Sequence, residues 1–209
     1  MQHIPVVAED SYDSSLYGLT PQKITELANW FANPLHRVAI VIGPTGSGKS
    51  TALPYYMMNP PKETGLPQDY FTRDGQIIHT QPRTMSAKGQ AKYVAKTIMH
   101  NEVGKGHNAG VAHSKHHQTD RRNLWVSVTD GTFINFIIQG KLGSYGYVII
   151  DEAHERSVNI DEILLLLKER LSLYPKLKVI VASATIDSEK FCDYFGSEIA
   201  TVIELEGKV

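Results

Sequence analysis

The stretch from Gly43 to Ser50 holds the residues whose types and spacing are best suited to binding phosphate. A glycine, four intervening residues, a second glycine, a lysine and a serine follow one another, which is the phosphate-binding loop pattern. In such a loop the backbone N–H groups point at phosphate oxygens, Lys49 directs a charge at the terminal phosphates, and the Ser50 hydroxyl can bind Mg²⁺. The alternative is a glycine-rich turn that binds nothing; the position between an apolar strand and a helix start argues against it.

A second set of reactive groups follows the apolar run Tyr147–Ile150. Asp151 and Glu152 come directly after it, and His154 lies two residues further on. Two carboxylates at the end of a buried strand suit a phosphate loop, because the first can hold Mg²⁺ and the second can polarise an attacking water molecule. Two acids that begin the next helix would be the ordinary explanation if no phosphate loop were present.

These groups require strands that end at one edge of a sheet. The run Val38–Ile42 is short, apolar and rich in β-branched residues, which is typical of a strand buried on both faces. Strands alternate with helices along the chain, so we predict an α/β fold with a wound, mostly parallel sheet and helices on both faces. Further strands are expected at Gln76–Thr80, Leu124–Thr129, Tyr147–Asp151 and Lys178–Ser183. Helices are expected at Thr51–Met58, Gln90–Asn101, Thr132–Gln139 and Ile160–Tyr174.

The chain is predicted to form one domain after a short lead-in. Residues 1–19 are polar and aperiodic, so they are assigned to a loosely docked lead-in segment, and residues 20–209 to the domain. Thr20 suits a helix N-cap and Pro21 the first helical position, and apolar residues recur at helical spacing as far as Phe31. This helix is expected to pack beside the phosphate-loop strand.

The composition excludes several classes of protein. The 209 residues are 42% hydrophobic, enough for one α/β core, and no apolar run is long enough for a membrane span. The N-terminus lacks a secretory signal, and the single cysteine, Cys192, cannot form an internal disulfide. We therefore expect a cytoplasmic protein with no membrane partner.

The net charge of −1 conceals an uneven distribution. Between Gly75 and Trp125 there are eight Lys or Arg residues, two acids and six histidines, whereas from Asp151 to the end seven basic residues face twelve acids. A basic middle block is compatible with a nucleic-acid backbone and equally with a solvated helix face.

Five ordered segments resemble the first RecA-like domain of DEAH-box (DEAH/RHA) superfamily 2 helicases. They are GPTGSGKST at 43–51, TQPRTMSA at 80–87, TDG at 129–131, DEAHERS at 151–157 and SATIDSEKF at 183–191. The resemblance runs from about Leu19 to Val209 and is closest to the bacterial members. It implies a RecA-like P-loop NTPase fold and an ATP-dependent helicase motor that uses ATP and Mg²⁺.

The resemblance also implies roles for matching residues. Lys49, Asp151, Glu152 and His154 are expected to take part in catalysis, with Glu152 as the base, and Ser50, Asp151 and Glu152 at the metal. Ser183 and Thr185 are expected to couple the nucleotide site to strand separation. The expected nucleotide-binding residues are Gly43, Thr45, Gly46, Ser47, Gly48, Lys49, Ser50, Thr51 and Tyr93. The expected nucleic-acid contacts are Arg83, Thr129, Asp130 and Gly131.

Two regions depart from the family pattern. Thr84 stands where relatives usually have a second arginine after TQPR, and the His-rich connection Val111–Asn123 replaces an acidic or aromatic stretch, so we expect a basic, solvated loop there. Tyr93 stands where many relatives place an arginine against the adenine. Its ring could stack on the base or pack in the helix beside Val94 and Ile98.

The leading hypothesis is an ATP-dependent helicase acting on single-stranded nucleic acid, with RNA favoured over DNA because it is the commoner substrate of the family. The alternatives are a nucleotide-dependent switch or scaffold, a DNA helicase and a small-molecule kinase. Glu152 argues against a switch, and a kinase leaves TQPR, TDG and SAT unexplained. The segment EIATVIELEGKV at residues 198–209 resembles the linker to a second RecA-like domain, which is absent from this chain and is expected in the full-length parent. We expect residues 1–209 alone to fold, bind nucleotide weakly and unwind nothing.

Overall fold

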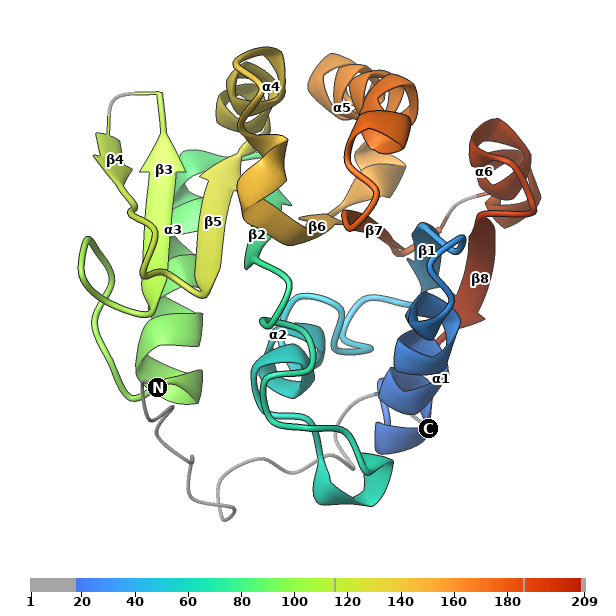
Figure 1. The fold of residues 1–209 in the computed structure, drawn as a ribbon, viewed down its shortest axis with the longest axis horizontal. Helices are drawn as coiled ribbons and strands as arrows, with labels where there is room; N and C mark the ends of the chain where they lie inside the picture. Colours follow the sequence, from blue (N-terminus) through green and yellow to red (C-terminus); the bar gives the residue numbers. More distant parts are fainter. Residues whose placement is uncertain (1–17, 115, 186, 208–209) are drawn as a thin grey trace.

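A computed structural model describes residues 18–114, 116–185 and 187–207, so most of the expected lead-in lies outside the described residues. Within these residues, eight strands form one sheet in the order β4-β3-β5-β2-β6-β7-β1-β8 (Figure 1). All neighbouring strands are parallel except β3 and β4. The strands are β1 Val38–Ile42, β2 Gln76–Gln81, β3 Ala109–His113, β4 His116–Gln118, β5 Trp125–Thr129, β6 Tyr145–Ile150, β7 Lys178–Ser183 and β8 Ala200–Glu204. The predicted wound, mostly parallel α/β fold is confirmed.

Helices cover both faces of this sheet, as Figure 1 shows. On one face lie α1 (Pro21–Ala32), α2 (Ala52–Met58) and α3 (Thr84–Tyr93), which continues into a π-helical turn at Val94–Ile98. On the other face lie α4 (Asp130–Ile138), α5 (Val158–Arg170) and α6 (Ser188–Phe195). Short 3₁₀ turns occur at Lys62–Thr64, Lys141–Ser144, Ala153–Glu155 and Leu171–Leu173. No helix in the described part of the chain is long and apolar enough to span a membrane.

Strand alternation divides the core into two layers. In β1, Val38 and Ile40 pack with α4, α5 and α6, whereas Ala39 and Val41 pack with α1 and α2. Because successive side chains of a strand point to opposite faces, an unbroken apolar run such as VAIVI is needed where helices cover both sides. The sheet core therefore holds β1 and its neighbours firmly, and the loops after their carboxyl ends carry the polar groups.

The first helix forms as its sequence predicts. Thr20 is the N-cap, its hydroxyl accepts a hydrogen bond from Lys23 N, and Pro21 occupies the first turn. The buried stripe of this helix is Ile24, Leu27, Ala28 and Phe31. The helix α3 begins six residues earlier than expected, directly after Arg83, because Pro82 keeps the preceding segment extended and the helical turn starts where that restriction ends.

Two expectations about connections are wrong. The His-rich segment forms the β3–β4 hairpin rather than a loop, and His113 is buried beside Val111 at the end of β3. The segment expected to be a linker contains β8, which pairs in parallel with β1 from Val38↔Ala200 to Ile42↔Glu204. Residues 200–204 therefore belong to the sheet of this domain, because their backbone groups complete the ladder beside β1.

Candidate nucleotide and nucleic-acid site

The phosphate loop connects β1 to α2 and is fixed at its start. Gly43 N donates a hydrogen bond to Ser183 O at the end of the neighbouring strand β7, at 3.1 Å. A Cβ atom at Gly43 would lie 2.7 Å from both Leu205 Cβ and Ser47 Oγ, so only glycine fits there. Gly46 and Gly48 have φ angles of 85° and 97°, which favour glycine. The geometry of the loop therefore favours glycine at each of the three positions, Gly43, Gly46 and Gly48.

Lys49 is turned into this loop. It is buried, and its ammonium group donates hydrogen bonds to Gly43 O, Pro44 O at 2.9 Å and Ser47 Oγ at 3.1 Å. Burial lowers the pKa of Lys49, and the negative charges of Asp151 and Glu152 oppose that change. The lysine charge therefore lies inside the curl of the loop, at the centre of the predicted phosphate site.

Asp151 lies at the end of β6, and four donors from the described part of the chain surround its carboxylate. Its Oδ2 accepts hydrogen bonds from Ser50 Oγ at 2.8 Å, Gln81 Nε2 at 2.7 Å and His79 Nε2 at 3.1 Å. Its Oδ1 accepts one from the backbone N–H of Glu152 at 2.9 Å. Burial would raise the pKa of Asp151, but the hydrogen bonds and the charge of His79 outweigh it and lower the pKa to about 2. Asp151 is thus held as a carboxylate.

The oxygen groups gathered here fit a magnesium ion. Mg²⁺ prefers hard oxygen ligands, and the Ser50 hydroxyl and the Asp151 carboxylate already lie within hydrogen-bonding distance of each other. The donor set is therefore that of a Mg²⁺ site in which an ion would be shared by these two groups.

Glu152 and His154 lie beside this carboxylate at the start of the turn after β6. Glu152 has a left-handed backbone with φ of 53°, which is uncommon for a non-glycine residue and is typical of functional sites. Burial, followed by the nearby charge of Asp151, raises the pKa of Glu152. His154 Nε2 lies 3.5 Å from Glu152 Oε2, and its Nδ1 accepts a hydrogen bond from Ala184 N at 3.3 Å.

The contact with Ala184 joins the two carboxyl ends of β6 and β7. Ser183, predicted for coupling, is buried at the end of β7, and its carbonyl accepts from the phosphate loop. Its hydroxyl makes no hydrogen bond to the described residues. Thr185, predicted for the same role, is exposed. The SAT segment therefore touches both the phosphate loop and, through Ala184, the histidine of the acidic motif.

The predicted nucleic-acid residues follow β2 and β5 at the same edge of the sheet. Gln81 pairs with Thr129 in register, so Arg83 and Gly131 come after neighbouring strands, and both are exposed. The hydroxyl of Thr129 lies 2.9 Å from that of Thr132 and caps no backbone group. Arg83 and Gly131 are thus exposed, and Thr129 is half-buried.

Asp130, by contrast, is interior. Its side chain is 2% exposed, and its Oδ1 makes no hydrogen bond to any described residue. Burial, with Glu155 and Asp151 adding to it, raises the pKa of Asp130 to about 6. The Thr80 side chain is close enough to favour the ionised form, although its hydroxyl has no hydrogen bond of ordinary geometry. The carboxylate of Asp130 therefore does not lie on the surface, where a contact with the nucleic acid was expected.

Tyr93 ends α3 next to the phosphate-loop helix. It is partly buried against the core layer of α1 and α2, and its hydroxyl donates a hydrogen bond to Thr51 O at 3.2 Å. This hydrogen bond places the ring beside the start of α2. The ring also packs against the core layer that contains Val94 and Ile98, as the packing alternative predicts, and stacking on adenine stays a prediction. Thr51 itself is the N-cap of α2.

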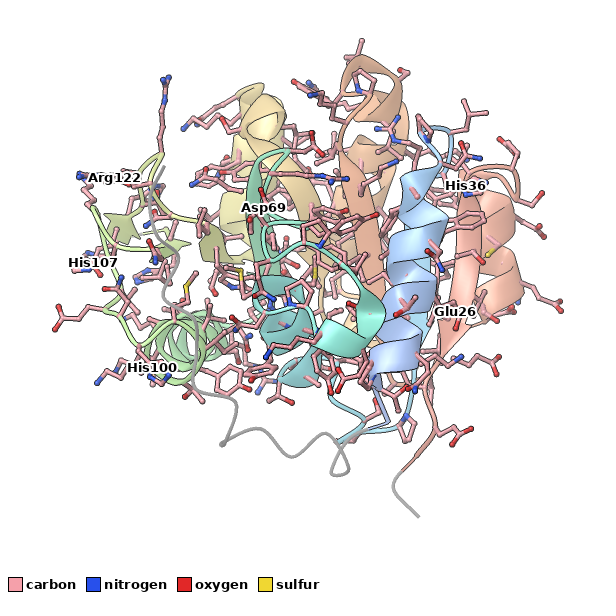
Figure 2. All side chains as sticks on the ribbon, turned by 60° about the horizontal axis from the view of Figure 1, so that its bottom comes forward. Glu26, His36, Asp69, His100, His107 and Arg122 are labelled. Atoms are coloured by element: carbon pink, nitrogen blue, oxygen red, sulfur yellow. The ribbon has the colours of Figure 1, made fainter. Side chains whose placement is uncertain are left out.

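The basic block of the sequence, residues 75–125, lies at one end of the folded domain. The strands β2, β3, β4 and β5, which come from the basic block, form one end of the sheet, and β7, β1 and β8 form the other (Figure 1). Figure 2 places His100, His107 and Arg122 on the flank of that first end, away from Glu26 and His36 on and after α1. The exposed Arg83 and the lysines of α3 therefore share one end of the molecule with the basic connections.

Sequence reasoning missed His79 and Gln81. Both are buried in β2, at alternate positions that share one face of the strand, and both donate to Asp151. The available signal was the pair of polar residues two apart at the carboxyl end of a strand, after the apolar Ile77 and Ile78. Nothing in the sequence named their partner, which lies 70 residues or more away.

Known proteins show similar sequences. The family model described as DEAD/DEAH box helicase matches residues 25–193. The ATP-dependent RNA helicase HrpA of Escherichia coli (strain K12) is 40% identical over 174 residues, which are 83% of this chain and 12% of that protein. The chain thus spans about one eighth of the length of this relative.

Proposed function

The chain belongs to the DEAD/DEAH box helicase family, and from this membership we propose that it is the ATP-binding first motor domain of an ATP-dependent nucleic-acid helicase. The observation that carries the proposal is the hydrogen bond between Ser50 in the phosphate loop and Asp151 in the acidic motif. It supports the proposal because the Ser50 hydroxyl, the buried Asp151 carboxylate and the adjacent Glu152 lie together at the edge of the sheet, as phosphoryl transfer to water requires.

In this proposal the loop residues bind and orient the nucleotide. Lys49 exchanges its contacts with loop oxygens for the β- and γ-phosphate oxygens, and the N–H groups of Gly46–Thr51 bind the remaining ones. Ser50 and Asp151 would hold Mg²⁺, which when bound would neutralise charge that develops on the phosphates. Glu152 accepts a proton from the attacking water, and its raised pKa makes it a better acceptor than an ordinary glutamate.

His154 and the SAT segment report on the state of this site. The contact between His154 Nδ1 and Ala184 N gives the acidic motif a direct link to the loop after β7. We propose that a change at the γ-phosphate moves Glu152 and His154 and thereby the Ser183–Thr185 segment. Such a change is local, and in the full-length parent a second RecA-like domain would convert it into closure around the nucleic acid.

RNA is the proposed nucleic-acid substrate. The relative's name describes an RNA helicase, and we extend that substrate to this chain with Arg83, Thr129 and Gly131 as backbone contacts. An RNA substrate agrees with the cytoplasmic location expected from the sequence. A second domain would supply arginines that act on the γ-phosphate, so the chain alone should hydrolyse ATP slowly and should not separate strands.

ATP turnover by the full-length parent, measured with and without single-stranded RNA, tests this function. We expect RNA to raise the turnover, matched DNA to raise it less, and Glu152→Gln to remove it. A parent that binds ATP without any stimulation by either polymer would support a nucleotide-dependent switch or scaffold instead. Strand displacement by a verified monomer of residues 1–209 would contradict the requirement for a second domain.

A further inference from the structure

Three side chains donate hydrogen bonds to one oxygen of Asp151, and they differ in where they come from. Ser50 belongs to the phosphate loop, whereas His79 and Gln81 belong to β2, inside the sheet. If Ser50 and Asp151 held a magnesium ion, the hydrogen bond between them would be given up. His79 and Gln81 approach the carboxylate from β2, which pairs with β6, so their hydrogen bonds to Asp151 can remain.

His79 is held in place by its surroundings. The ring is fully buried, it packs edge-on against Trp125 with 5.4 Å between ring centroids, and its backbone pairs in register with β5 and β6. Its Nδ1 makes no hydrogen bond to any described residue, so the Nε2 contact with Asp151 is the one polar interaction found for this ring besides its close approach to Gln81. Burying an imidazole with one unpaired nitrogen costs free energy, and an apolar residue would avoid that cost.

Gln81 completes the arrangement from the next position on the same face of β2. It is buried, and its amide N–H donates the shortest of the three side-chain hydrogen bonds to Oδ2. An amide and an imidazole placed two residues apart on a rigid strand fix both the rotamer of the carboxylate and the direction of its lone pairs. Groups that orient a metal-binding carboxylate in this way commonly change metal affinity by about 10- to 100-fold.

We propose that His79 and Gln81 are positioning residues that hold the Asp151 carboxylate in the geometry needed to bind the magnesium ion of Mg·ATP. The proposal rests on the proposed function, since it assigns a role within the same nucleotide site. In this proposal neither residue binds the nucleotide or the nucleic acid directly. They act only through Asp151. Replacing them should therefore lower the part of the nucleotide affinity that depends on Mg²⁺ and leave the part that comes from the phosphate loop unchanged.

The test is a comparison of nucleotide binding with and without magnesium. Titration of the full chain with a fluorescent ATP analogue is carried out in excess Mg²⁺ and again in EDTA, on a Glu152→Gln background that prevents turnover. Gln81→Met keeps the length of the side chain and removes the donor. We expect it to weaken binding of the Mg²⁺ complex by about 10-fold or more while leaving binding in EDTA unchanged.

Two further variants separate positioning from packing. His79→Gln keeps a donor at a similar reach, so it should retain most of the magnesium effect, whereas His79→Phe keeps the ring against Trp125 and should lose it. Gln90→Met is the matched control, because Gln90 is a buried glutamine of α3 whose amide nitrogen makes no hydrogen bond to the described residues. This control should bind the ATP analogue as tightly as the chain that carries Glu152→Gln alone, both in Mg²⁺ and in EDTA.

The outcomes distinguish this proposal from the one it rests on. Equal losses with Mg²⁺ and EDTA in Gln81→Met, at an unchanged melting temperature, would overturn the positioning role, and so would no loss at all. If the unaltered site binds ATP no better with Mg²⁺ than without it, the proposed magnesium site itself fails. If the unaltered site shows a magnesium effect and the β2 variants keep it, only the role of His79 and Gln81 is wrong.

Discussion

Ser50 Oγ lies 2.8 Å from Asp151 Oδ2, although the two residues follow strands β1 and β6, which are separated by β7 in the sheet. The contact thus spans the carboxyl end of an intervening strand. Ser50→Ala removes the hydroxyl and leaves the carboxylate with its β2 donors. We expect this variant to lose the magnesium-dependent part of ATP affinity and to retain the part measured in EDTA. Ser86→Ala, on the exposed surface of α3, is a control for loss of a hydroxyl.

Lys49→Ala should weaken ATP binding both in excess Mg²⁺ and in EDTA. The variant removes the ammonium group that lies inside the loop, and hydrogen bonds to charged groups are each worth about 1.5–3 kcal/mol, so a loss of about 100-fold or more is expected. Isothermal titration with ATP measures it, and Lys105→Ala, at an exposed position, should bind normally. Unchanged affinity in Lys49→Ala would disprove the phosphate-loop assignment.

Glu152→Gln should bind Mg·ATP and fail to hydrolyse it, because the shape of the side chain remains and only the proton acceptor is lost. The raised pKa of Glu152 adds a pH signature. A base must be ionised, so the turnover of the full-length parent should decline on the acid side at a higher pH than an ordinary glutamate would cause. Normal turnover by Glu152→Gln would place the base at another residue.

Asp130→Asn should stabilise the protein at neutral pH. The pKa of Asp130 is raised from 3.8 to about 6, so between these values the folded protein holds a proton that the unfolded chain releases. The contribution of this carboxyl to stability therefore falls as the pH rises from about 4 to about 6, and the carboxylate is a cost above that. The variant should gain up to about 3 kcal/mol in the free energy of unfolding at pH 8 and little at pH 4.

Denaturant unfolding at the two pH values measures the difference between Asp130→Asn and the parent. The exposed Asp69, whose position Figure 2 labels, supplies the control Asp69→Asn, which removes a carboxylate from the surface instead of the interior. A gain that is the same at pH 4 and pH 8 would mean that burial of the charge at Asp130 is not its cause.

Arg83→Gln should weaken binding of single-stranded RNA and make that binding less sensitive to salt. An arginine that contacts one phosphate contributes about one released counterion, so the slope of log affinity against log salt should fall by roughly 0.7 for a single strand. Fluorescence anisotropy at several salt concentrations gives the slope. Arg73→Gln, at an exposed position ion-paired with Asp74, should leave the slope unchanged.

The central strands and the first helix could be predicted because their signals are local. The run Lys178–Ser183 forms β7 with the predicted bounds, and β1 follows its apolar run, since both are covered by helices on each face. The capping residue and the apolar stripe of α1 are likewise encoded within a few positions. Patterns of this kind fix an element before its neighbours are known.

The strands near the edges of the sheet were harder to predict because their stability comes from their partners. The segment Ala109–His113 contains a glycine and reads weakly as a strand. A Cβ atom at Gly110 would lie 2.5 Å from Asn123 Oδ1, so the glycine permits close packing against a residue that the strand pattern does not reveal. The donors on Asp151 were missed for a related reason, since His79 and Gln81 acquire their meaning only when β2 and β6 lie side by side.

The strand β8 has a practical consequence for any shortened form of this protein. It covers one side of β1, and Leu205 N donates a hydrogen bond to Ile42 O just before the phosphate loop. Ending the chain before residue 200 would expose the N–H and C=O groups of VAIVI, an apolar segment without charge or proline. Such an edge pairs readily with other copies, so the truncated protein should aggregate on expression, whereas one that extends past Leu205 keeps β1 covered.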